Sequence, residues 1–68
     1  MKRSILTNRE QEIFTLLVNG NTTRDIALKL KISEKTVRNH ISNAIQKLEV
    51  KGRASAVVEL LKLGEITL

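Results

Sequence analysis

The amino-acid sequence predicts an all-α fold, a bundle of four helices, on three observations. Apolar residues recur at intervals of three and four along most of the 68 residues, which is the period of an amphipathic helix. Helix-start signals occur at Thr7, Thr22 and Ser33, and glycines that can end a helix occur at Gly20 and Gly64. No useful length of sequence shows strand-like alternation, and proline is absent. We therefore expect helices at about residues 8–18, 23–30, 34–48 and 53–63.

The first helix begins with a capping box. In T-N-R-E, the Thr7 hydroxyl can accept from the backbone amide of Glu10, and the Glu10 carboxylate can reach back to the amide of Thr7. Apolar residues of the following turns supply its inner face, namely Ile13, Phe14, Leu16 and Leu17. Residues 1–6 carry no comparable signal. The sequence therefore predicts a flexible N-terminus over 1–6 and one folded domain over 7–68.

The second and third helices are joined very tightly. Thr22 repeats the capping pattern with Asp25, and about two turns of helix follow. Only two or three residues, around Lys31 and Ile32, separate this helix from Ser33, the expected cap of the third. Two short helices connected in this way, the second with a polar outer face, are typical of a helix-turn-helix.

The third helix has two faces that require different partners. At 100° per residue, one arc of about 100° is apolar and contains Val37, Ile41, Ala44, Ile45 and Leu48. A second arc of similar width is polar and contains Lys35, Arg38, Asn39, Ser42 and Gln46. The polar set is poorly suited to catalysis but well suited to hydrogen bonds with base edges and phosphates in a DNA groove.

Positive charge is concentrated around this helix. Residues 29–53 carry seven basic and two acidic side chains, whereas 1–28 carry four and three and 54–68 carry one and two. The whole excess of the net charge of +5 therefore lies in the middle third. Such a patch attracts polyanions, of which nucleic acid is the commonest, although a merely solvated charged face is the alternative.

The fourth helix has more apolar surface than one domain needs. Its apolar residues cover about 220° of the helical circumference, whereas one core contact needs about 100°. We expect one part to face the core, with Ala56, Val57 and Leu60. The remainder predicts a homodimer interface through Ala54, Val58 and Leu61. Deeper burial of the helix in its own domain is the alternative.

Several classes of protein are disfavoured. With one histidine, one aspartate and no cysteine, the sequence offers no catalytic triad, metal site or Gly-rich phosphate loop, so we expect no enzyme, no metal and no cofactor. No apolar run approaches a membrane span and no secretory signal is present, which favours a cytoplasmic protein. Phe14 is the only aromatic residue, which disfavours binding of single strands by stacking. A helical protein–protein interaction module remains the alternative from a different class.

The chain resembles the LuxR/GerE-type (NarL/FixJ-like) DNA-binding domain of bacterial regulators, from Leu6 to about Leu68. Five motifs in order carry the resemblance: L-T-N-R-E at 6–10, D-I-A at 25–27, I-S-E-K-T-V-R-N-H-I at 32–41, K-L-E-V-K-G-R at 47–53 and A-V-V at 56–58. Each is weak alone, but the five at this spacing are specific. One departure is Glu49, where the family often has glycine; a positive φ there would cost on the order of 1 kcal/mol and alter the turn before Lys51 and Arg53.

The resemblance implies roles for individual residues. Arg38, Asn39 and Ser42 are expected to contact bases in the major groove of double-stranded DNA, where a bidentate pair typically gives about 1–3 kcal/mol of discrimination. A second set is expected on the DNA backbone, namely Thr22, Thr23, Lys35, Thr36, Lys47, Lys51 and Arg53. The fourth helix would carry a dimer contact, and RNA polymerase is a further expected partner.

The resemblance is strongest to the stand-alone members of the family that regulate genes in spore-forming bacteria. The methionine start and the lack of room for a sensory domain favour that subgroup, so we expect a transcription regulator of sporulation genes. The alternative is the DNA-binding output domain of a longer two-component response regulator.

Overall fold

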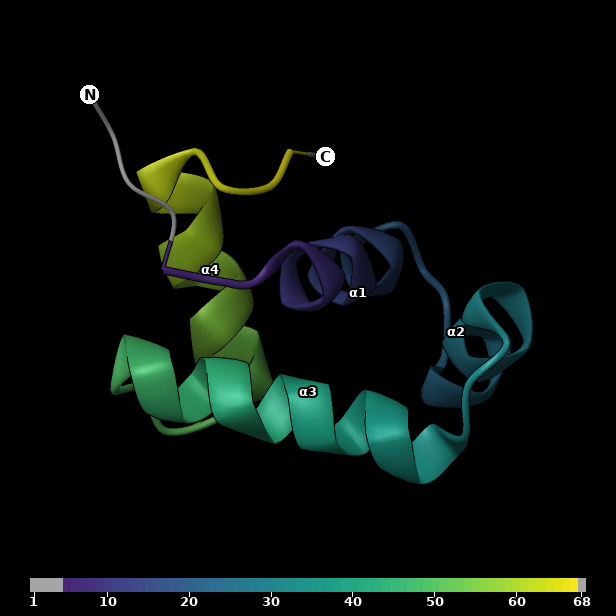
Figure 1. The fold of residues 1–68 in the computed structure, drawn as a ribbon. Helices are drawn as coiled ribbons and strands as arrows, with labels where there is room; N and C mark the ends of the chain where they lie inside the picture. Colours follow the sequence, from purple (N-terminus) through teal and green to yellow (C-terminus); the bar gives the residue numbers. More distant parts are fainter. Residues whose placement is uncertain (1–4, 68) are drawn as a thin grey trace.

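The computed structural model describes residues 5–67, which form four helices in the order α1 (Asn8–Val18), α2 (Thr23–Leu30), α3 (Glu34–Leu48) and α4 (Arg53–Leu63). Within this range there is no strand. Figure 1 shows α3 along the lower edge of the molecule, with α1 above it, α2 beyond one end and α4 rising near the other. The predicted fold class and helix bounds are confirmed.

Three of the four helices begin with a side-chain cap, as the sequence predicts. The Thr7 hydroxyl accepts from the amide of Glu10 at 3.1 Å, and a Glu10 carboxylate oxygen accepts from the amide of Thr7 at 3.0 Å. Thr22 and Asp25 repeat both bonds at 3.1 and 3.0 Å. Ser33 accepts from the amide of Thr36 at 3.0 Å. These bonds satisfy amides that the first helical turn leaves without a partner.

All four helices end with the same backbone bond, in which an amide just beyond the helix donates to a carbonyl five residues earlier. The donor and acceptor pairs are Asn21 with Leu16, Ile32 with Ala27, Val50 with Ile45, and Glu65 with Leu60, at 3.1, 3.0, 3.4 and 2.9 Å. The left-handed residue that makes the turn is glycine after α1 and α4, as expected. After α2 and α3 it is Lys31 (φ 60°) and Glu49 (φ 55°).

Glu49 stands where the family often has glycine, and the structure shows which backbone conformation it adopts. The position does adopt positive φ, so the turn out of α3 keeps its geometry and glutamate bears the strain instead. Nothing in the sequence around Lys31 predicts the matching strain after α2, because lysine there reads as an ordinary linker residue.

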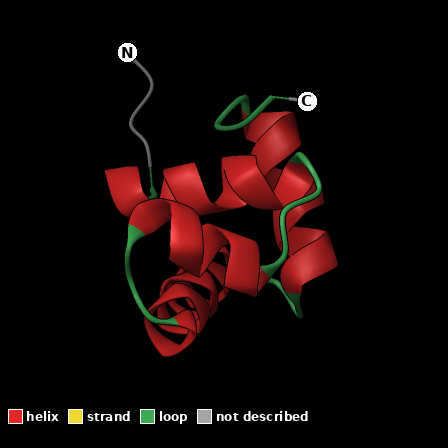
Figure 2. Cartoon of the chain, turned by 90° about the vertical axis from the view of Figure 1, so that its right-hand side faces the viewer, coloured by secondary structure: helices red, strands yellow, loops and turns green. Residues whose placement is uncertain are grey.

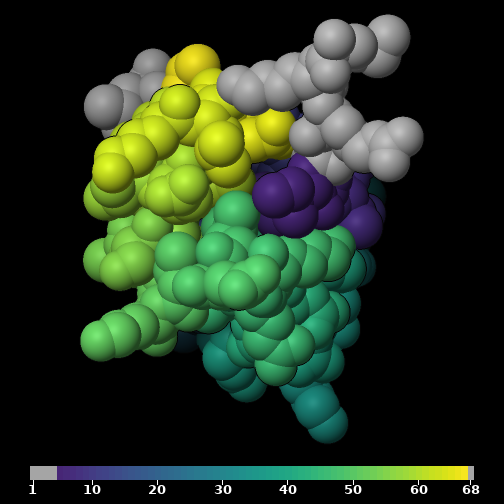
Figure 3. Space-filling model, turned by 90° about the vertical axis from the view of Figure 1, so that its left-hand side faces the viewer, coloured from purple at the N-terminus to yellow at the C-terminus, as the bar shows by residue number. Residues whose placement is uncertain are grey.

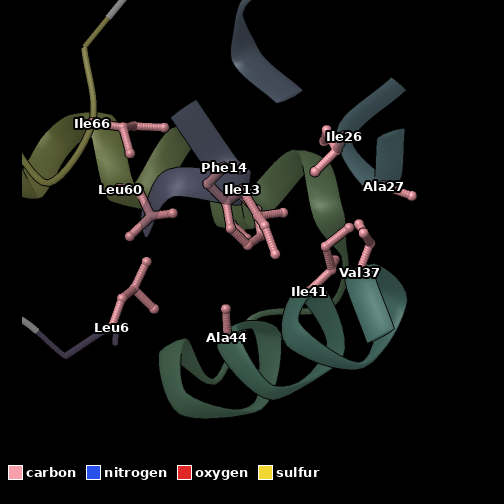
Figure 4. Packing of buried hydrophobic residues seen from close by; sticks show 11 residues of the cluster. Leu6, Ile13, Phe14, Ile26, Ala27, Val37, Ile41, Ala44, Leu60 and Ile66 are labelled. Carbon is pink, nitrogen blue, oxygen red and sulfur yellow. The ribbon is translucent and has the colours of Figure 1, made fainter. Parts of the chain in front are cut away.

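The core lies between all four helices and includes both ends of the described chain. Figure 4 shows side chains of α1 and α2 above Val37, Ile41 and Ala44 of α3, with α4 contributing from the side. Leu6 and Ile66, which lie outside the helices, are also buried, at 6% and 4% exposure. Most of the N-terminus expected to be flexible, residues 1–4, lies outside the described residues, but Leu6 belongs to the core.

Replacement of Glu49 by glycine is expected to raise the free energy of unfolding by about 0.5–1 kcal/mol. Glycine removes left-handed backbone strain of about 1–2 kcal/mol. It also raises the conformational entropy of the unfolded chain, which cancels part of that gain. Gln46→Gly, at an exposed position inside α3, is the matched control and should lose about 1 kcal/mol. Urea titration measures the free energy of unfolding of both variants. If Glu49→Gly lost as much stability as the control, backbone strain at Glu49 would be contradicted.

Candidate nucleic-acid interface

The two faces of α3 separate in the structure as the helical wheel predicts. Val37 and Ala44 are fully buried and Ile41 nearly so. The residues predicted to contact bases, Arg38, Asn39 and Ser42, are exposed, and so are Lys35 and Gln46. Seen from the side in Figure 1 and nearly end-on in Figure 2, α3 keeps one flank uncovered by any other helix. The polar residues therefore form a continuous, accessible face on a helix whose other face is fixed.

Arg38 has a carboxylate partner that the sequence analysis did not identify. One guanidinium nitrogen of Arg38 lies 3.6 Å from a carboxylate oxygen of Glu34, one helical turn earlier. Both side chains are about half exposed, so the pair contributes little to stability. The Glu34–Arg38 spacing of four residues was the available sequence signal.

Six of the seven residues predicted near phosphates gather at three places. Thr22 and Thr23 lie at the start of α2, and Lys35 and Thr36 lie at the start of α3. The hydroxyl of Thr22 already serves as a cap acceptor, and that of Thr36 is 2.9 Å from the hydroxyl of Ser33. Helix N-termini present free amides and a partial positive charge, which suits phosphate oxygens.

The third place is the turn between α3 and α4. Lys51 and Arg53 are exposed there, next to the left-handed Glu49. In Figure 3 this turn lies at the edge of the face formed by the end of α3 and by α4.

Lys47 differs from the other predicted backbone contacts, because its ammonium is already paired. Its Nζ lies 2.7 Å from a carboxylate oxygen of Glu10 in α1. Glu10 is only 3% exposed, and the same oxygen accepts from the amide of Thr7. Burial raises the pKa of Glu10, but hydrogen bonds from Lys47 and Thr7 and the charges of Lys47 and His40 together hold that pKa below its ordinary value. The carboxylate is therefore ionised at neutral pH.

The residues of α4 predicted for the core and for dimerisation differ in exposure. Ala56 and Leu60 face the core, and Ala54 and Val58 are exposed, with Val58 at 52%. Leu61 is half-buried and packs against the core cluster, as Val57 also does. The accessible apolar strip on α4 is therefore narrower than the sequence suggests.

Between residues 5 and 67 no three His, Asp or Glu side chains are grouped so that they could hold a metal ion. No helix in that range is long and apolar enough to cross a membrane.

The fold and the exposed polar face of its third helix define a helix-turn-helix regulatory protein. Residues 4–60 match the GerE family, described as bacterial regulatory proteins of the luxR family, and the chain belongs to that family. It is 65% identical over 66 residues to the spore germination protein GerE of Bacillus subtilis. The matched residues make up 97% of this chain and 89% of that protein.

Solved structures agree with this assignment. The transcription factor GerE superposes with a TM-score of 0.92 at 66% identity, covering 96% of this chain and 97% of that one. The response regulator ChrA of a heme-sensing two-component system superposes with a TM-score of 0.84 at 36% identity. The match covers 97% of this chain and 33% of ChrA. The transcriptional regulatory protein DegU of Brevibacillus brevis is 52% identical over 60 residues, which make up 88% of this chain and 25% of the length of DegU.

Glu10→Gln is expected to lower the free energy of unfolding at pH 7 by about 1–3 kcal/mol, since two hydrogen bonds lose their charged acceptor. The folded-state pKa of Glu10 lies below its ordinary value, so this contribution is complete above that ordinary value and is lost as pH falls through the folded pKa. Urea titrations at a series of pH values, from 7 downwards through the acid range, measure how the difference between Glu10→Gln and the unaltered protein changes. Glu12→Gln, an exposed carboxylate of α1, is the control. If the difference in free energy of unfolding between Glu10→Gln and the unaltered protein did not shrink in acid, the ionised pair of Glu10 and Lys47 would be contradicted.

Proposed function

We propose that the protein is a transcription regulator that binds double-stranded DNA by inserting the polar face of α3 into the major groove. The observation that carries this proposal is the exposure of Arg38, Asn39 and Ser42 on a helix whose opposite side is buried. A side chain can discriminate bases only if its helix is held rigidly against the duplex. The identity to a spore germination protein supports a role in controlling sporulation genes.

We assign roles to individual residues on the basis of their positions. Arg38 can bind the O6/N7 edge of guanine and Asn39 the N6/N7 edge of adenine, with Ser42 one turn further along the same face. Backbone contacts are assigned to the two helix N-termini and to the α3–α4 turn, through Thr22, Thr23, Lys35, Thr36, Lys51 and Arg53. They fix the register of α3 without reading sequence.

The active form is proposed to be a homodimer that joins two copies through α4. Val58 and Ala54 are exposed apolar residues on one strip of this helix, and Leu61 borders it. A two-fold dimer would present its two α3 helices to half-sites about one turn of DNA apart. RNA polymerase is a further proposed partner of the DNA-bound dimer. The cytoplasm, where the DNA lies, is the proposed location.

The second candidate is the same DNA-binding role within a longer response regulator. The specific observation in its favour is that DegU and ChrA contain this module as only a quarter to a third of their chains. The interface would be the same in both cases.

Arg38→Ala is expected to weaken binding to the preferred duplex by about 1–3 kcal/mol while changing binding to random duplex much less. The preferred duplex is first selected from a random library with the unaltered protein. Lys51→Ala is the control, because loss of a phosphate contact weakens both complexes similarly. Fluorescence anisotropy measures the affinities, with helicity checked by circular dichroism. Equal losses on both duplexes in Arg38→Ala would contradict base recognition by Arg38.

Val58→Glu is expected to shift the protein towards monomer and to weaken binding to the paired half-sites by tenfold or more, because a carboxylate at the centre of an apolar contact would lose its hydration. Leu28→Glu on α2 is the matched control, since Leu28 is also an exposed apolar residue, at 72%, but lies outside the α4 strip. Sedimentation equilibrium gives the masses. A dimer of unchanged stability in Val58→Glu would contradict the assignment of α4.

A further inference from the structure

Glu10 is buried although it is charged, and among residues 5–67 no other charged side chain is. Its cap bond with Thr7 accounts for its place in the sequence motif but not for its burial, because the equivalent Asp25 caps α2 while remaining exposed. The difference is that Glu10 also accepts from Lys47, which lies 37 residues later in the chain on α3. This contact ties the first turn of α1 to the last turns of the DNA-reading helix.

Lys47 lies between the two faces of α3. At 100° per residue it is about 80° from Asn39 on the polar face and about 60° from Ala44 on the buried face. Its side chain is 36% exposed, so it borders both the core and the surface proposed for DNA. An ammonium has three N–H donors, and the bond to Glu10 uses one of them. Lys47 can thus approach a phosphate without leaving Glu10.

We propose that Glu10 is a positioning residue for DNA recognition, which acts by fixing Lys47 and cancelling its charge. The pair is neutral as a unit, since the carboxylate is ionised and lies 2.7 Å from the ammonium. Lys47 then offers a phosphate a directed hydrogen bond but little net charge. Affinity that comes from net charge is independent of sequence, so the pair limits non-specific binding and leaves base recognition by α3 unaffected.

This inference rests on the proposed function and is specific to one residue pair. The slope of log affinity against log salt counts the phosphates that are neutralised, at about 0.9 for each. Merely structural support by Glu10 would lower the affinity of a weakened protein for all duplexes but would not add a charge to the interface. The salt slope therefore separates the two roles.

The test measures binding of the full chain to random and to selected duplex between 50 and 200 mM salt. Glu10→Gln keeps the shape and the cap acceptor but releases the charge of Lys47, so its slope should steepen by about 0.9, which is roughly threefold more loss of affinity over that range. Glu10→Gln combined with Lys47→Gln should return the slope to that of the unaltered protein. An unchanged slope in Glu10→Gln would overturn the inference.

Lys51→Gln is the control that separates this inference from the proposed function. Its side chain is exposed and has no carboxylate partner among the ion pairs of residues 5–67, so its removal should make the slope shallower by about 0.9. A shallower slope there with an unchanged slope in Glu10→Gln refutes only the role of Glu10. No salt-dependent binding by any of the proteins refutes DNA binding itself. If Glu10→Gln is partly unfolded, all proteins are compared in trimethylamine N-oxide, which favours the folded state.

Discussion

The structure depends on the packing of one side of α3 against the other helices. Val37, Ile41 and Ala44 are held by side chains of α1 and α2, and α4 closes the core from the side. With only 68 residues, the chain has little apolar surface to spare, so a helix that must leave half its circumference free needs close packing on the other half. The short turn between α2 and α3, with its left-handed Lys31, fixes the angle at which the two helices meet.

Local features were predictable from the sequence, and features that depend on tertiary placement were not. The capping boxes at Thr7 and Thr22 and the two faces of α3 depend on residues within a few turns of each other, so spacing alone located them. The ion pair between Glu10 and Lys47 joins distant segments. Moreover, the capping box by itself accounts for a glutamate at position 10, so nothing else in the sequence indicates that this glutamate is buried.

The same distinction explains the remaining differences. The sequence places Leu6 in a flexible end because nothing next to it is periodic, yet Leu6 is buried in the core together with Ile66. The helical wheel places Leu61 on the outer strip of α4, but in the structure Leu61 is half-buried against the core cluster. A helical wheel gives directions from the helix axis, and it cannot show how far neighbouring segments extend around the helix.

Burial of Leu6 and Ile66 has a consequence for how this domain can be joined to other proteins. Both segments that flank the helical bundle insert a side chain into its interior, so a fragment cut at Asn8 and Leu63 would lack two buried side chains of the core. A tag, a fusion partner or a natural neighbouring domain attached directly at those helix boundaries would remove two interior contacts. Junctions placed outside Leu6 and Ile66 preserve them.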